Sequence, residues 1–318
     1  MKGKHARVWL MIGLLTIFLA LFSMLVPQPL HTQSSQASVP SSSTAVGQGR
    51  TAIYLTVQDQ QGGFVSSLTR EDLRLVVDDK YQDVVSLSFW NSQFANLALL
   101  LDWSGSRRIA LPYGEIDPAI GFFNSMLSDN RAGLATRFTD FVKPIIDLTR
   151  DPAVMERSLK AQRSEPLRGS TPLYDAIRWA DQRLSRAPGY RAIIVVSDGE
   201  DNSSRVNAKE TILETLRANA AVYFINLSDL EPHRPRNLKK AVDQFVQQIT
   251  EKTGGAAISV RNQQDMARAF SSIEDSLRNL YLLEFDSLPE GPPGMLHTLR
   301  IETDRKDLRV RSPQLLAP

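Results

Sequence analysis

A carboxylate and two hydroxyls follow the apolar run Leu97–Leu101, in the spacing Asp102-x-Ser104-x-Ser106. On a tight loop this spacing can bring three side-chain oxygens toward one point. Such an oxygen set suits a hard divalent cation such as Mg²⁺, Mn²⁺ or Ca²⁺. The segment therefore predicts a cation site directly after a strand.

Two further stretches carry similar side chains. The apolar run Ile193–Val196 leads into Ser197-Asp198-Gly199, and Thr171-Pro172 stands between them and the first stretch. Pro172 suits the first position of a helix, which predicts Thr171 as its N-cap. Each stretch alone has an ordinary explanation as a turn or a cap. Together they indicate one site, because open α/β sheets bind ligands outside the carboxyl ends of their strands.

The elements that must position these residues are apolar strands alternating with amphipathic helices. We expect helices at 115–127, 151–162, 172–186, 207–219, 237–253 and 263–280. The expected strands between them are Leu97–Leu101, Ala132–Phe138, Ile193–Val196, Ala221–Ile225 and Ala256–Val260. Phe141–Leu148 follows a two-residue turn and is expected to pair antiparallel. The pattern predicts an α/β fold with a mostly parallel sheet and helices on both faces.

The flanks of this block have the short, alternating pattern of strands. These strands are expected at Ala52–Gln58, Leu73–Val77, Val84–Trp90, Tyr281–Phe285, Leu296–Glu302 and Leu308–Arg311. Neither flank has enough strands for a core of its own. We therefore expect 51–92 and 281–318 to form one discontinuous β-rich domain around an α/β domain at 93–280.

The N-terminus carries the pattern of a membrane signal. Lys2, Lys4 and Arg7 precede an apolar run from Val8 to Val26, which is near the length that spans a bilayer. Residues 1–26 are expected to be an anchor or an export signal that places the body outside the cytoplasm, or releases it if the signal is cleaved. Residues 27–50 are rich in serine and are expected to form a flexible linker.

Composition excludes several other classes. The 318 residues contain no Cys, so thiolate metal sites, disulfides and a Cys nucleophile are excluded. Four scattered His leave little basis for a zinc hydrolase. Four of the 37 basic residues and none of the 35 acidic ones lie in residues 1–50, so the rest of the chain is slightly acidic. This charge distribution predicts no nucleic-acid-binding surface.

The order Asp102-x-Ser104-x-Ser106, Thr171, Asp198 resembles the metal-ion-dependent adhesion site (MIDAS) of the von Willebrand factor type A (VWFA) domain. The neighbouring phrases resemble a bacterial VWFA-related subgroup. These phrases are Leu68–Leu73, Thr171–Ile177, Ser197–Asn202, Thr253–Gly255 and Tyr281–Leu283. The resemblance implies a Rossmann-like VWA sheet inserted in a small β-sandwich-like domain built from both flanks.

The resemblance also implies roles for the five residues. Ser104, Ser106 and Thr171 would offer hydroxyl ligands to the cation, while Asp102 and Asp198 would hold it largely through water. A divalent ion with so few direct carboxylates demands another anionic oxygen, which an Asp or Glu of a partner can supply. Mg²⁺ is the expected ion, with Mn²⁺ or Ca²⁺ as alternatives.

Three neighbouring side chains are candidate ligand contacts. Arg107 and Arg108 follow Ser106, where the family often has Met. They would oppose a cation unless they point away, and they could also hold an acidic ligand or be plain surface residues. Trp103 could contact a ligand or pack against the sheet.

We expect a membrane-tethered, non-enzymatic module that binds protein partners through a divalent cation. The alternatives are a metal-dependent phosphoester hydrolase, with Asp102 and Asp198 on Mg²⁺ and Ser104 near the reacting group, and a scaffold with a vestigial metal site. Nucleophile–base pairing is not evident in the sequence, which favours binding over catalysis.

Overall fold

The computed structural model describes residues 50–90, 94–108, 111–230, 235–288, 291–292 and 294–317. The expected anchor at 1–26 and all of the expected linker except Arg50 lie outside these residues. Within the described ranges, no helix has both the length and the apolar character that crossing a membrane requires.

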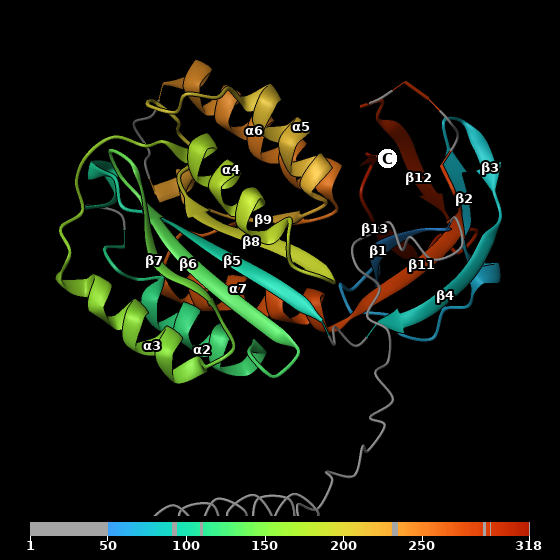
Figure 1. Ribbon diagram of the computed structural model, residues 1–318, viewed down its shortest axis with the longest axis horizontal. Coiled ribbons are helices and arrows are strands. Elements are labelled where there is room, and N and C mark those ends of the chain that lie inside the picture. Colours follow the sequence, from blue (N-terminus) through green and yellow to red (C-terminus); the bar gives the residue numbers. More distant parts are fainter. Residues whose placement is uncertain are drawn as a thin grey trace, which may run out of the picture. The chain divides into compact units, whose positions relative to one another are not determined.

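The centre of the fold is a six-stranded sheet (Figure 1). In spatial order its strands are β10 (Ala256–Ser259), β9 (Ala221–Asn226), β8 (Tyr190–Ser197), β5 (Ala95–Asp102), β6 (Arg131–Phe138) and β7 (Val142–Thr149). All neighbouring pairs are parallel except β6 and β7, which are antiparallel as expected from the short turn between them. The predicted α/β fold with a mostly parallel sheet is therefore confirmed.

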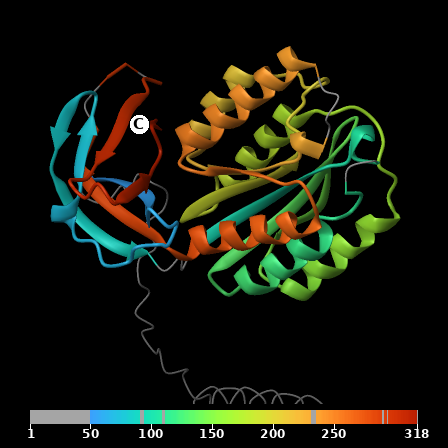
Figure 2. The same ribbon diagram turned by 180° about the vertical axis from the view of Figure 1, so that it is seen from behind.

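Helices cover both faces of this sheet (Figures 1 and 2). One layer contains α2 (Ile116–Met126), α3 (Pro152–Ala161) and α7 (Gln263–Arg278). The other contains α4 (Leu173–Leu184), α5 (Ala208–Ala218) and α6 (Arg236–Thr253). Strand β5 is fully buried because alternate residues serve the two layers: Leu99 packs in the core of the first, and Leu100 in that of the second.

The two flanks of the chain pair with each other in two four-stranded sheets. The first is β13 (Leu308–Arg311), β1 (Arg50–Asp59), β11 (Leu280–Asp286) and β4 (Val84–Trp90). The second is β14 (Leu315–Leu316), β12 (His297–Glu302), β2 (Arg74–Val77) and β3 (Lys80–Gln82). A separate core that includes Leu55, Leu75 and Leu283 lies within this β-rich part. The short strands β3 and β14 were not expected from the sequence.

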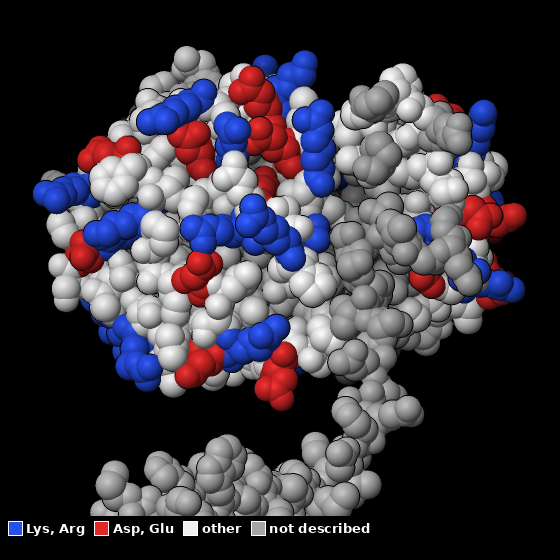
Figure 3. Space-filling model, in the orientation of Figure 1, with Lys and Arg blue, Asp and Glu red and all other residues white. Residues whose placement is uncertain are grey.

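Charged side chains are mixed on the molecular face drawn in Figure 3, where Lys and Arg are interspersed with Asp and Glu. Many of the exposed charges form local ion pairs, such as Arg183 with Asp147 and Arg305 with Asp307. Pairs of this kind contribute little to stability individually.

Candidate metal site

The candidate site begins at the carboxyl ends of two neighbouring parallel strands. Strand β5 ends at Asp102, and β8 ends at Ser197, directly before Asp198. Leu101 pairs with Val196 in the register of these strands, so the two carboxylates leave the sheet side by side. Gly199 has a φ of 82°, which allows the chain to turn away after Asp198.

Asp102 is 1% exposed, and both of its carboxylate oxygens are hydrogen-bonded. Oδ1 accepts from the backbone N–H of Ser104 at 2.9 Å, and Oδ2 accepts from the Ser197 hydroxyl at 2.6 Å. The pKa of Asp102 is raised to about 6, first by burial and second by the nearby Asp198 carboxylate, against the hydrogen bonds from Ser104 and Ser197. Two buried carboxyl groups thus lie close enough to repel each other.

Two serine hydroxyls connect the Asp102 loop to Asp198. Ser104 Oγ lies 3.0 Å from Ser106 Oγ, and the Ser106 hydroxyl donates to Asp198 Oδ2 at 3.1 Å. Ser104 is buried, whereas Ser106 is exposed at the start of the short 3₁₀ helix η2 (Gly105–Arg108). Asp198 Oδ1 accepts from the backbone N–H of Glu200 at 2.9 Å. The site is therefore buried at its base and open on the Ser106 side.

The residues just before Thr171 form backbone hydrogen bonds to the loop that carries Asp102 and Ser104. Arg168 N donates to Trp103 O at 2.9 Å, and Gly105 N donates to Gly169 O at 3.2 Å. The segment before Thr171 is thereby fixed against the Asp102 loop. Thr171 itself is 4% exposed.

The expected role of Thr171 as a helix N-cap is wrong. Helix α4 begins at Leu173 with Pro172 at its N-cap, and no side chain caps it from that position. Residues about 30 positions later perform this role: Asp201 Oδ2 accepts from Tyr174 N at 3.0 Å, and Ser204 Oγ accepts from Asp175 N at 3.0 Å. Among the described residues, the Thr171 hydroxyl has no hydrogen-bond partner, so the helix does not use it.

The loop after β8 holds Thr171 in place. Asn202 Oδ1 accepts from Thr171 N at 2.8 Å, and Asn202 N donates to Thr171 O at 3.1 Å. Asp201 of the same loop caps α4. The next helix, α5, is capped by Asn207.

The structure thus joins Asp102, Ser104, Ser106 and Asp198 through side-chain and backbone hydrogen bonds, and it brings the Thr171 segment against the same loop. One further residue, which the sequence did not mark as part of the site, takes part in this network. Ser197 is fully buried, and its hydroxyl donates to Asp102 and accepts from Gly199 N at 3.0 Å. Its position between an apolar strand and Asp198 was the available signal.

The candidate ligand contacts lie differently. Trp103 is 1% exposed, packs against Tyr113 and donates to Glu165 O at 3.3 Å, so it belongs to the core. Arg107 is also 1% exposed and forms an ion pair with Glu115 at 2.8 Å. Neither side chain is at the surface where a ligand would meet it. The side chain of Arg108 lies outside the part of the chain that the structure describes.

The donor set fits a hard cation. The two carboxylates have their oxygens engaged by protein donors, which leaves hydroxyl oxygens as direct ligands and the carboxylates as partners for metal-bound water. A cation would also relieve the repulsion between Asp102 and Asp198. Groups of three or more His, Asp or Glu that could hold a metal do not occur among the described residues, so a carboxylate- or histidine-rich centre is not formed there.

Neither the protein-family models nor the curated proteins contain a match to this chain. Solved structures do match. An aerotolerance-related membrane protein from Bacteroides fragilis with multiple mutations to serine is 20% identical, covers 57% of this chain and 98% of its own, and has a TM-score of 0.46. A von Willebrand factor type A structure from Catenulispora acidiphila is 12% identical, with 89% and 75% covered and a TM-score of 0.46.

A manganese-loaded TRAP protein from Plasmodium vivax is 16% identical, with 72% of this chain and 97% of that chain covered and a TM-score of 0.42. These similarities concern the fold alone. The strand order, the antiparallel edge strand and the two helix layers give this chain a VWA-like fold.

Proposed function

We propose that this chain is a divalent-cation-dependent protein-binding module, which holds Mg²⁺, or alternatively Mn²⁺ or Ca²⁺, with Asp102, Ser104, Ser106, Thr171 and Asp198. The cation would take an Asp or Glu side chain of a partner protein as a further ligand. The N-terminal segment would tether the module on the extracytoplasmic side of a membrane.

The observation that carries this proposal is the hydrogen-bonded chain from Asp102 through Ser104 and Ser106 to Asp198 at one end of the sheet. Hydroxyls are neutral ligands, so they leave a bound divalent ion with most of its charge. A carboxylate from a partner is the ligand that such an ion favours. Because Ser106 is exposed, that carboxylate has a path to the site.

We propose binding and not catalysis. Of the four His, the described one is His297, which lies in the β-rich part and contacts Asp78 at 2.6 Å. It is therefore no base for the Ser104 hydroxyl. The two serine hydroxyls instead contact each other, as metal ligands on one loop would.

The test measures cation binding by the full chain, kept soluble in a mild detergent. Mg²⁺ or Mn²⁺ should raise the thermal midpoint saturably, because a ligand that binds only the folded state stabilises it by about 2.7 kcal/mol at a hundredfold excess over Kd. Ser106→Ala should weaken cation binding roughly 10- to 100-fold. The matched control is Ser203→Ala, an exposed serine farther along the loop after β8 that forms no part of the proposed site, which should bind as the natural chain does.

Partner binding is tested with an array of Asp- and Glu-containing peptides and their Asn and Gln counterparts. Retention should require both the carboxylate and Mg²⁺. Retention that persists in EDTA would favour the scaffold with a vestigial site. Turnover of p-nitrophenyl phosphate that is lost in Asp102→Ala would favour the hydrolase.

A further inference from the structure

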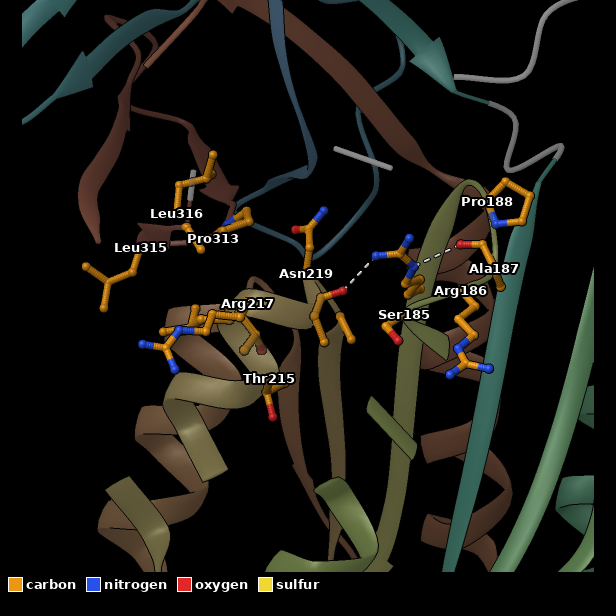
Figure 4. Close-up of a pocket in the computed structure, with 16 residues that line it drawn as sticks. Ser185, Arg186, Ala187, Pro188, Thr215, Arg217, Asn219, Pro313, Leu315 and Leu316 are labelled. Carbon is orange, nitrogen blue, oxygen red and sulfur yellow. Dashed lines mark hydrogen bonds between the residues drawn. The ribbon is translucent and has the colours of Figure 1, made fainter. Parts of the chain in front are cut away.

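A cavity of about 350 Å³ lies at the opposite end of the six-stranded sheet from the candidate metal site (Figure 4). Its walls come from the turn between α4 and β8, the start of β8, the end of α5 and the turn that follows it, the last residue of α6, and the C-terminal segment. Strand β8 starts beside the cavity and runs eight residues to Ser197, which is roughly 25 Å. The volume is within the range of small-molecule sites.

The buried charged group of this cavity is the guanidinium of Arg191, a residue that is 6% exposed. Its Nε donates to Ala187 O at 3.0 Å, and its Nη1 donates to Ala218 O at 2.8 Å; these bonds are the dashed lines of Figure 4. Among the described residues, Nη2 has no hydrogen-bond partner and no acidic side chain pairs with Arg191. Burial lowers the pKa of Arg191, and the nearby Tyr54 hydroxyl opposes this shift.

Two more arginines stand at the mouth. Arg186 and Arg217 are exposed, lie on opposite sides of the cavity, and turn their guanidinium groups away from each other (Figure 4). Neither has an acidic partner among the described residues, and the described lining contains no Asp or Glu. The potential inside is therefore positive, and these two arginines add to it through space without contacting the centre.

The remaining wall is apolar. Pro313, Leu315 and Leu316 of the C-terminal segment line it, and Figure 4 shows them together on the side of Arg217. The C-terminal segment is fixed there, because Gln314 N donates to Lys252 O at 3.1 Å and Leu299 N donates to Gln314 O at 2.8 Å. The cavity thus combines a hydrophobic surface with a buried guanidinium whose Nη2 has no hydrogen-bond partner among the described residues.

We propose that this cavity binds a small organic oxyanion, a carboxylate or a phosphate ester, whose charged group accepts from Nη2 of Arg191 and whose apolar body packs on Pro313, Leu315 and Leu316. A guanidinium has the planar donor geometry that carboxylates and phosphates match. The site does not depend on the proposed metal site, because it uses none of the same residues.

The test titrates the full chain at constant ionic strength with benzoate, phenyl phosphate, inorganic phosphate and the neutral analogue benzamide, and follows the thermal midpoint and the heat of binding. Benzoate or phenyl phosphate should bind saturably, and the tighter of the two identifies the acid group. Inorganic phosphate should bind more weakly and benzamide should not bind. Absence of saturable binding by both aromatic anions, or equal binding of benzamide, would overturn the proposal.

Variants assign the binding to this cavity. The double variant Arg186→Glu/Arg217→Glu changes two exposed side chains, so the fold is retained, and it should weaken anion binding about five- to tenfold through the reversed potential. Arg157→Glu on α3 is the matched control, exposed and outside the cavity, and should bind as the natural chain does. Arg191→Gln should abolish binding. Equal affinity in the double variant and the control would place the anion elsewhere and refute the assignment.

Discussion

Asp181 is a buried carboxyl group of α4 that the proposed site does not use. It is 4% exposed, and its Oδ2 accepts from the Thr215 hydroxyl of α5 at 2.7 Å, while its Oδ1 has no partner among the described residues. The pKa of Asp181 is raised to about 8, chiefly by burial; the Thr215 hydrogen bond opposes this rise and the charge of Glu214 adds to it. The folded state therefore holds a proton that the unfolded chain releases near pH 4.

This difference fixes the sign of a pH dependence. Between about pH 4 and pH 8 the folded state binds more protons at Asp181 than the unfolded state does, so this group lowers stability as pH rises and has no further effect above about pH 8. Asp181→Asn should therefore stabilise the chain by several kcal/mol at pH 9, with about 5 kcal/mol as the upper limit, and by much less at pH 5. Urea unfolding at the two pH values measures this difference.

The control is Asp243→Asn, an exposed carboxylate of α6, whose effect should be small at both pH values. A stabilisation by Asp181→Asn that is the same at pH 5 and pH 9 would show that Asp181 does not titrate as its burial implies. The variant keeps an oxygen that can accept from Thr215, so loss of that hydrogen bond does not confound the result.

The residues of the candidate site could be predicted from the sequence where they directly follow a recognisable strand. Asp102 and Asp198 follow apolar runs, and parallel strands place such residues on one edge. The prediction that Thr171 is the N-cap was wrong because several side chains can accept from the first backbone N–H groups of a helix. Here Asp201 does so from a loop that is distant in sequence. No local pattern could show that Asp201 would be there.

At the scale of elements, a buried ion pair connects the 3₁₀ helix η2 to the start of α2. Arg107 and Glu115 are each 1% exposed and are joined at 2.8 Å. Burial raises the pKa of Glu115, and the charge of Arg107 opposes this rise. Because Arg107 directly follows Ser106, this pair ties the 3₁₀ helix that carries the Ser106 hydroxyl to the start of α2.

Breaking the pair on one side should cost more than replacing both partners. Arg107→Met leaves a buried carboxyl group and should destabilise the chain by about 3–5 kcal/mol, whereas Arg107→Met/Glu115→Leu should recover most of that loss. Urea unfolding of the two variants beside the natural chain measures both values. If the double variant is no more stable than the single one, the cost comes from lost packing and not from an uncompensated charge.

Sequence patterns indicated the elements better than their connections. Apolar runs such as Ala221–Ile225, which forms most of β9, were evident as strands because both faces of the sheet are covered by helices. Apart from the antiparallel pair β6 and β7, which the short turn between them predicted, the order of the strands in the sheet was not predictable, because pattern alone allows any parallel strand to neighbour any other. Arg107 illustrates the same limit: its burial depends on Glu115, which the sequence offered no reason to pair with it.

At the scale of the whole described part, side chains of the β-rich flanks pack against the α/β part, among them Leu296 and Leu315 against the core beneath α4, α5 and α6. Tyr54 of β1 packs edge-to-face on Tyr190 of β8, with ring centroids 4.9 Å apart, and the hydroxyls of Tyr190 and Tyr223 lie 3.3 Å apart. The chain also passes between the two parts twice, because β4 leads to β5 and α7 leads to β11. Two parts joined in this way should unfold together as long as the tyrosine contact is intact.

Tyr54→Ala tests this coupling. Removing a partly buried aromatic ring should cost about 2–3 kcal/mol, and because the loss falls at the contact between the parts, calorimetric unfolding should separate into two transitions. The β-rich part, which has the smaller core, should melt first.

Phe89→Ala is the matched control, because Phe89 packs on Tyr281 inside the β-rich part, with ring centroids 5.3 Å apart. That variant should lower the thermal midpoint while keeping a single transition. Two transitions in both variants would contradict the role of the Tyr54–Tyr190 contact, because weakening the β-rich core would then be enough to uncouple the two parts.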